Sequence, residues 1–317
     1  MKLSDLIEYA ITIDNSSLDK TTDIINATIT GIFLDIENNG NKPPIKKYID
    51  KLQQSTSVLA ESIDAIDADL NELKQELKEH RKVLEIQALK ESYQIYERGL
   101  RRKHNSWQIL NTHMNHYMIY KKDDRQLYAS RLQFYSSMHH AALLVRPLFG
   151  ELVSNLVAND PLYIADEEPM LLDHTRQLFN EEYQSRIRYK VFNETKLPYI
   201  ANIMPAGQLG FIVFNEFLNV RPLEIIKQYL QEIFIMLKAG GVALITFNNT
   251  DIPQSARNFE AGQYCYTPAT MLELSVEANG FEILKRVNTP TNVSWLEIKK
   301  PGVLTSLRGG QALVELK

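Results

Sequence analysis

Short apolar runs alternate with helical patterns through the second half of the chain, between Pro161 and Asn249. The apolar runs are PLYIADEEP, IRYKVF, LGFIVFNEFLNV and VALITFNN. Between the first two runs, MLLDHTRQLFNEEYQSR places Leu172, Thr175 and Phe179 on one helical face. Buried strands that alternate with helices are typical of β-α-β units. The pattern therefore predicts a parallel sheet covered by helices on both faces.

The same pattern predicts the core of this sheet and its closing elements. The central strands should bury Leu162, Ile164, Ile212, Val213, Phe214, Leu244 and Ile245. Segment 222–241 predicts a helix that ends at the paired glycines Gly240 and Gly241, which suit a helix C-cap. Segments 281–287 and 293–300 predict a final hairpin whose last strand is antiparallel to the sheet.

The amino-terminal half of the chain predicts helices. Residues 1–46 are predicted to form a helical segment that ends at a turn-rich stretch with Pro43 and Pro44. From 47 to 128 the pattern predicts a long helix or coiled coil with connecting helices. Its heptad seam carries Leu59, Ile63, Ile66, Leu70, Leu73, Leu77, His80 and Leu84, and then shifts to Ile86, Leu89, Tyr93, Tyr96 and Leu100.

Two interpretations of this seam stay open. The 59–100 heptad region can pair with copies of itself, which makes the protein a homo-oligomer, or fold back on the N-terminal helices of its own chain. The narrow stripe of two apolar positions in seven favours association. Segment 101–140 interleaves basic and aromatic residues, which suits either nucleic-acid binding or packing against the following domain. Its His113 and His116 have no acid or cysteine at matching spacing, so we predict no metal site.

Composition narrows the function classes. The chain has 317 residues and a formal net charge of −4, which argues against a general nucleic-acid or membrane-surface binder. Cys265 is the only cysteine, so we expect no internal disulfide and no cysteine-rich zinc site. The first residues carry acids early, unlike a signal peptide, and no apolar run reaches the roughly 20 residues of a membrane span. A cytoplasmic protein without a membrane partner is therefore expected.

A family resemblance rests on five segments in order: ADEEPMLLDHTRQLF, YKVFNETKLPY, LGFIVFNEFLNV, LKAGGVALITF and YTPATMLELSVEANGFEILKRV. Their order and spacing resemble the class I S-adenosylmethionine (SAM) dependent methyltransferases, over about half the chain from near Ala141 to near Lys300. The resemblance implies an α/β domain over 129–317: a doubly wound, mostly parallel Rossmann-like sheet with a C-terminal antiparallel strand. It also implies SAM as cofactor.

The first strand and its turn depart from the family pattern. In the family that the chain resembles, glycines in this turn let the backbone approach the cofactor. Here Gly150 occupies one glycine position, whereas Arg146 and Leu148 occupy the other two. Leu144 stands where an acid is expected to hold the amino group of SAM. These replacements predict either loss of ordinary SAM binding or a pocket in which Arg146 binds a carboxylate or phosphate.

The resemblance implies other cofactor contacts. Asp166, after the second strand, would accept the ribose hydroxyls, and Glu167 could replace it. Alternatively, Asp166 and Glu168 cap the helix that begins at Pro169. Asn193 stands at an adenine-contacting position, unless it is a turn residue.

Asn215 and Glu216 follow the fourth strand, where the resemblance places groups near the methyl acceptor. Glu216 is predicted as a general base or substrate-orienting group, with Asn215 beside it; the alternative is a strand-end carboxylate without a chemical role. Two functions therefore stay open. One is a SAM-dependent methyltransferase for a small molecule, sugar or protein. The other is a non-catalytic structural or scaffolding protein with a protein partner, whose methyltransferase-like domain has lost its cofactor.

Overall fold

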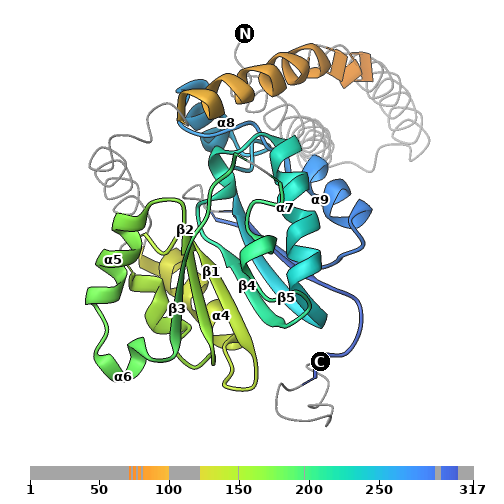
Figure 1. Ribbon diagram of the computed structural model, residues 1–317. Helices are drawn as coiled ribbons and strands as arrows, with labels where there is room; N and C mark the ends of the chain where they lie inside the picture. The colour runs from red at the N-terminus through yellow and green to blue at the C-terminus, as the bar shows by residue number, and fades with distance from the viewer. Residues whose placement is uncertain are drawn as a thin grey trace, which may run out of the picture. The chain divides into compact units, whose positions relative to one another are not determined.

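The computed structural model describes residues 71–72, 74–75, 78–79, 81–99, 122–148, 150–195, 197–289 and 294–305 (Figure 1). The chain divides into two compact units, Met1–Gln87 and Ala88–Lys317. The described residues of the first unit are all helical. Segment 1–46, most of the heptad seam and residues 101–121 lie outside the described residues, so the coiled coil, the oligomer and the domain boundaries stay predictions.

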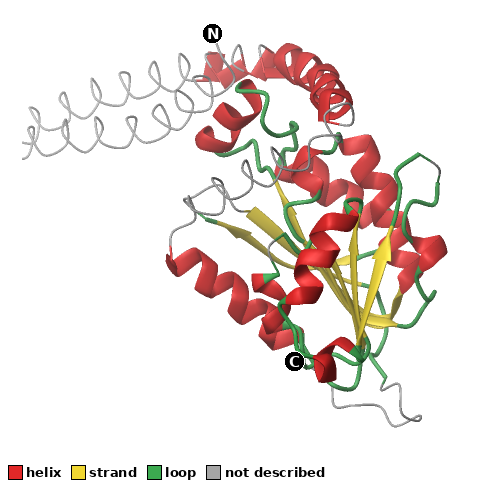
Figure 2. Ribbon diagram, turned by 60° about the vertical axis from the view of Figure 1, so that its left-hand side comes forward, coloured by secondary structure: helices red, strands yellow, loops and turns green. Residues whose placement is uncertain are grey.

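A seven-stranded sheet forms the centre of the second unit (Figure 2). Its strands are β1 (Ala141–Val145), β2 (Leu162–Asp166), β3 (Ile187–Val191), β4 (Leu209–Phe214), β5 (Leu237–Phe247), β6 (Glu282–Asn288) and β7 (Ser294–Lys299). The spatial order is β3-β2-β1-β4-β5-β7-β6. Strands β1 to β5 are parallel, and β7 is antiparallel to both β5 and β6. The predicted mostly parallel sheet with an antiparallel last strand is confirmed.

Helices cover both faces of this sheet. The helices are α4 (Lys122–Tyr135), α5 (Pro169–Gln177), α6 (Glu181–Gln184), α7 (Leu223–Met236), α8 (Pro253–Glu260) and α9 (Ala269–Ala278), with short 3₁₀ turns η1 (Glu151–Asn155), η2 (Ala201–Ile203) and η3 (Leu218–Val220). One core cluster joins α4, η1 and α5 to the sheet, and a second joins α7 and α9 to its other face. None of the described helices has the length and apolar character needed to cross a membrane.

Alternation along the strands divides the core between these two clusters. On β1, Leu144 faces the α4 cluster while Leu143 and Val145 face the α7 cluster. The seven predicted core residues are each at most 1% exposed: Leu162, Ile164, Ile212, Val213, Phe214, Leu244 and Ile245. Strands buried on both faces explain why these segments are nearly continuous apolar runs in the sequence.

The junction of α7 and β5 corrects one prediction. The helix ends at Met236, and β5 begins at Leu237, so the paired glycines lie inside the strand rather than at a helix C-cap. Gly240 has φ 76°, and a Cβ there would lie 2.3 Å from the backbone nitrogen of Leu304. The backbone after β7 comes so close to Gly240 that a residue with a Cβ would not fit there. In the sequence, a glycine required for this reason looks the same as one at a helix C-cap.

The part of the helix from Ala88 to Gly99 packs within the second unit. Ala88, Ser92 and Ile95 are buried on one face of it. The Ser92 hydroxyl accepts the backbone N–H of Tyr266 at 2.8 Å. This end of the predicted heptad region therefore contacts the α/β domain of its own chain.

Candidate functional site

The carboxyl ends of the five parallel strands meet at one edge of the sheet. The strand order reverses between β1 and β4, because β1 leads to β2 on one side and β4 leads to β5 on the other. In open α/β sheets, ligands bind outside the carboxyl ends of the strands at such a switch point. The turns after β1, β2, β3 and β4 therefore form the candidate site.

The turn after β1 has the backbone of a glycine-rich turn with larger side chains in it. Arg146, Leu148 and Gly150 have φ of 60°, 53° and 81°, all in the left-handed region that favours glycine. A Cβ at Gly150 would lie 2.5 Å from the tip of the Leu178 side chain, which is 51% exposed and can move aside, so glycine is favoured here by its φ rather than by space. For an arginine and a leucine the left-handed region costs roughly 1–2 kcal/mol each. The strain is therefore concentrated at the positions where the resemblance implies glycine.

The side chain of Arg146 spans the switch point. Its Nη1 donates to the backbone carbonyl of Glu216 at 2.9 Å, and its guanidinium carbon lies 5.4 Å from the centre of the Phe217 ring. The Asn215 side chain in turn donates to the backbone carbonyl of Arg146 at 3.4 Å. These contacts join the turn after β1 to the turn after β4.

The turn after β4 is itself strained and tightly held. Glu216 has φ 48° and is 3% exposed. Its backbone N–H donates to the hydroxyl of Thr246 on β5 at 2.6 Å. Non-glycine residues in this region persist only where the surroundings hold them, and they gather at ligand sites.

A buried ionic cluster fills the corner between β2, β3 and α7. Arg221 pairs with Glu167 at 2.7 Å and with Glu194 at 3.0 Å, and these three side chains are 2%, 6% and 1% exposed. The guanidinium lies 3.4 Å above the Phe217 ring. Glu194 also accepts hydrogen bonds from the hydroxyls of Tyr229 and Tyr96. The sequence analysis did not identify this cluster, because no spacing in the sequence links Arg221 to carboxylates 27 and 54 positions away.

The two arginines have opposite electrostatic environments. Burial lowers the pKa of Arg146, as does the neighbouring charge of Arg221, and the nearby carboxylates offset this only in part. Burial also lowers the pKa of Arg221, but Glu194 and Glu167 raise it by more, so the net shift is upward. Ion pairing thus compensates the buried charge of Arg221 better than the partly buried charge of Arg146.

Asp166 is near enough to both arginines for each positive charge to act on its pKa. Burial raises its pKa from the usual 3.8 to about 6, although Arg146 and the N–H of Glu168 act in the opposite direction. Its Oδ1 accepts the backbone N–H of Glu168 at 2.9 Å, which makes a turn before α5. Glu168 is the N-cap residue of α5 but makes no side-chain capping hydrogen bond, so the predicted capping of this helix by Asp166 and Glu168 is wrong. Its Oδ2 is buried and has no hydrogen-bond partner among the described residues.

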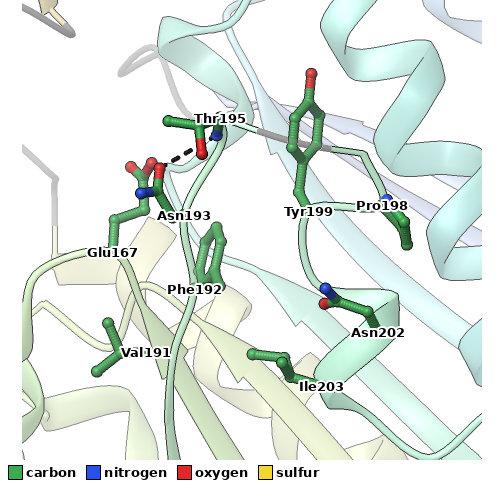
Figure 3. A pocket seen from close by; sticks show the side chains of 9 residues that line it. All are labelled: Glu167, Val191, Phe192, Asn193, Thr195, Pro198, Tyr199, Asn202 and Ile203. Atoms are coloured by element: carbon green, nitrogen blue, oxygen red, sulfur yellow. Dashed lines mark hydrogen bonds between the residues drawn. The ribbon is translucent and has the colours of Figure 1, made fainter.

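A first pocket of about 480 Å³ lies beside the ends of β2 and β3 (Figure 3). It is lined by Glu167, Val191, Phe192, Asn193, Thr195, Pro198, Tyr199, Asn202 and Ile203. The Asn193 side chain accepts the backbone N–H of Thr195 at 3.1 Å, so it makes a turn as well as lining the pocket. Tyr199 and Asn202 face Asn193 across the pocket in Figure 3.

A second pocket of about 300 Å³ lies beyond β4. It is lined by Asp124, Arg125, Gln126, Tyr128, Ala129, Glu151, Leu152, Asn155, Asn215 and Glu216. The predicted site residues are thus distributed over the edge: Glu167 and Asn193 line the first pocket, and Asn215 and Glu216 line the second. Arg146, Gly150 and Asp166 are not among the residues that line either pocket.

The residues present do not fit SAM in the orientation that the resemblance implies. The methionine arm would lie at the turn after β1, where the Arg146 side chain is bonded to the Glu216 carbonyl. The ribose would need an accessible carboxylate, but Asp166 is 4% exposed and the Glu167 carboxylate is paired with Arg221. Leu144, at the position of the expected acid, is fully buried in the α4 cluster. The edge of the sheet is therefore occupied by the chain's own side chains between two separate pockets.

Comparison with known proteins gives structural similarity only. No family model matches the sequence, and the curated proteins give no sequence match. Among solved structures, the N-methyltransferase NodS from Bradyrhizobium japonicum, in complex with S-adenosylhomocysteine, is 15% identical over 57% of this chain and 87% of its own, with a TM-score of 0.45. A SAM-dependent methyltransferase from Aquifex aeolicus is 14% identical over 52% and 84%, with a TM-score of 0.39. The cyclase SpnF is 14% identical over 55% and 80%, with a TM-score of 0.43.

Proposed function

We propose that this chain is a methyltransferase-like protein that has lost SAM binding and acts as a non-catalytic interaction module. The observation that carries the proposal is the position of Arg146, whose guanidinium bonds to the Glu216 carbonyl across the switch point. A cofactor in this place would have to break that charge-assisted bond, worth about 1.5–3 kcal/mol. This alone reduces affinity by about tenfold to a hundredfold.

The ribose position supports the same proposal. Glu167 could accept ribose hydroxyls only by leaving Arg221, and removal of one partner from a buried pair costs about 3–5 kcal/mol. Asp166 could do so only by becoming accessible and charged, which burial opposes. The hydrogen bond of Arg146 and the state of the carboxylates of Glu167 and Asp166 thus each oppose cofactor binding.

Titration calorimetry with SAM and S-adenosylhomocysteine tests this proposal. We expect no binding heat from the wild-type protein at about 1 mM ligand. Arg146→Gly removes the guanidinium and the strained Cβ together, whereas the matched Arg146→Met keeps the Cβ and an aliphatic chain. Binding by Arg146→Gly but not by Arg146→Met or the wild type supports a former SAM site that the Arg146 side chain now fills. Micromolar binding by the wild type contradicts the proposal.

A SAM-dependent methyltransferase is the second candidate. It is favoured by the left-handed backbone of Arg146, Leu148 and Gly150, which is the conformation of a glycine-rich cofactor turn. In that case Asp166→Ala should weaken SAM binding by about tenfold or more, because the ribose would lose a charge-assisted acceptor. Glu216 and Asn215 would then be the groups nearest the methyl acceptor, a small molecule, sugar or protein.

A homo-oligomer held by the 59–100 heptad region, in the cytoplasm, completes the proposal. Leu70 and Leu77 lie on the predicted seam, and aspartate at both positions would place charges in the interface. Light scattering on the full chain should show a multiple of the 36.5 kDa mass that falls to one copy in the double variant. A wild-type monomer contradicts association and leaves the intramolecular bundle.

A further inference from the structure

Strand β3 is an edge of the sheet. Among the described residues, β2 is the only strand that pairs with it. The backbone carbonyl of Arg186 and the backbone N–H of Phe192, at either end of β3, both bond to β2. Because successive residues of a strand point their backbone groups to opposite sides, the N–H and C=O groups of Ile187, Tyr189 and Val191 point to the free edge. Such an edge is a template for the addition of another extended chain.

One face of this edge strand carries two positive charges. Arg188 and Lys190 lie opposite Tyr163 and Ala165 of β2, which pack in the α7 cluster. Arg188 is exposed and Lys190 is partly exposed. The Arg188 guanidinium donates to the backbone carbonyl of Ser185 at 2.6 Å, and neither cation forms an ion pair with a described residue. Two unpaired cations, two positions apart, therefore line one face of the free edge.

The first pocket continues this face at the carboxyl end of β3. Val191, the last residue of the strand, lines the pocket and is 51% exposed. The walls are the segment after β3 and the segment that leads to η2, which face each other in Figure 3. Phe192 and Tyr199 in these walls belong to the α7 cluster, so the pocket and the two cations lie on the same side of the sheet. At about 480 Å³, the pocket has room for an apolar side chain.

The edge at β6 carries charges of both signs, and they have partners. Arg286 pairs with Glu273 on α9, and Glu282 pairs with Lys299 on β7. Charges on an edge strand protect it from pairing with other edges. Protection accounts for the charges of β6, but it does not explain why those of β3 have one sign and lie beside a pocket.

We propose that β3 binds an extended acidic segment of a partner protein, which adds to the edge of the sheet and places an apolar side chain in the first pocket. Carboxylates at alternate positions of this segment would lie opposite Arg188 and Lys190, where opposite charges on neighbouring strands stabilise pairing. The Glu167 carboxylate in the pocket lining is paired with Arg221, so its charge is compensated. A second copy of β3 would instead bring like charges together, which is destabilising.

The inference deepens the proposed function, because it names the partner of the interaction module. It also rests on that function, since a cofactor at this edge of the sheet would compete for the first pocket.

Titration calorimetry with acetylated, amidated peptides on the full-length protein tests the site. The peptide ETETETF places its glutamates and its phenylalanine on one face of a strand, and FTETETE does so in the opposite direction. We expect one of the two to bind at about 1 mM or below. The control TEETTFE has the same composition without the alternation, and ETETETT lacks the apolar side chain. Both controls should bind at least about tenfold more weakly.

Hydrogen exchange measured by mass spectrometry gives a second readout. Addition of a strand should slow the exchange of the β3 amides, because the N–H groups of Ile187, Tyr189 and Val191 gain partners. Binding without slower exchange in β3 would contradict strand addition.

Charge reversal identifies the strand. The double variant Arg188→Glu with Lys190→Glu should bind the acidic peptide at least about fivefold more weakly and should gain binding of KTKTKTF. Lys285→Glu, on the exposed edge strand β6, should leave acidic-peptide binding unchanged. Wild-type affinity in the double variant, or equal binding of TEETTFE, would overturn the proposal.

S-adenosylhomocysteine separates this inference from the proposed function. Its binding by the wild type overturns the proposed function. Absence of peptide binding, when S-adenosylhomocysteine does not bind either, overturns this inference alone. Tighter binding of an oligothymidylate than of either acidic peptide would assign the cations to nucleic acid and would also overturn it.

Discussion

Arg221 and Arg146 occupy neighbouring turns at one edge of the sheet, yet they serve different purposes. Arg221 has two buried carboxylate partners and a raised pKa, and its contacts connect β2, β3 and α7. Arg146 donates to a backbone carbonyl, has a lowered pKa and is held in a left-handed conformation. A buried charge with matched partners belongs to the framework of the fold. A partly buried charge with poor compensation and a strained backbone, such as that of Arg146, lies where a ligand site is expected.

The largest expected effect is the loss of Arg221. Arg221→Met leaves Glu167 and Glu194 buried without their cation, and this should lower the free energy of unfolding by about 3–5 kcal/mol. Urea unfolding measures the change. The matched control is Arg176→Met, which removes an exposed pair with Asp173 and should cost less than about 1 kcal/mol. Similar losses in the two variants would show that the Arg221 cluster is not part of the framework.

A smaller effect follows from the raised pKa of Asp166. The native state holds the proton more tightly than the unfolded chain, so stability is lost as pH rises from about 4 to about 6 and is then constant. A rise from 3.8 to about 6 corresponds to at most about 3 kcal/mol, at roughly 1.36 kcal/mol for each pKa unit. Asp166→Asn should therefore be more stable than the wild type at about pH 8 and equal to it near pH 4. A pH-independent difference would contradict the raised pKa.

The smallest expected effect is that of Arg146→Gly on stability. The variant loses a charge-assisted hydrogen bond of about 1.5–3 kcal/mol and relieves left-handed strain of roughly 1–2 kcal/mol. These contributions nearly cancel, so urea unfolding should show a change of about 1 kcal/mol or less. A loss as large as that of Arg221→Met would make Arg146 a framework residue and remove the contrast between the two turns.

The sequence was sufficient to predict the sheet. Apolar runs such as the one around Val213 are long enough to be buried on both faces, and burial of this kind depends on local pattern. The antiparallel last strand followed from a hairpin signal. The predicted end of α7 at the paired glycines was wrong. A glycine that a distant backbone contact requires looks the same in the sequence as a glycine at a helix C-cap.

The site was predicted only in part. The glycine positions at Arg146 and Leu148 could be counted from the strand, and both have the left-handed backbone there. The ion pairs of Arg221 could not be predicted, because they join elements far apart in the chain. Whether an acid such as Asp166 is accessible depends on these tertiary contacts rather than on its place after a strand.

A crystal structure determined with saturating S-adenosylhomocysteine tests the central claim most directly. We predict no density for a nucleoside between Gly150, Asp166 and Asn193, and a guanidinium of Arg146 that stays on the Glu216 carbonyl at 2.9 Å. Density for the nucleoside, with Arg146 turned away and a carboxylate on the ribose hydroxyls, would contradict the account.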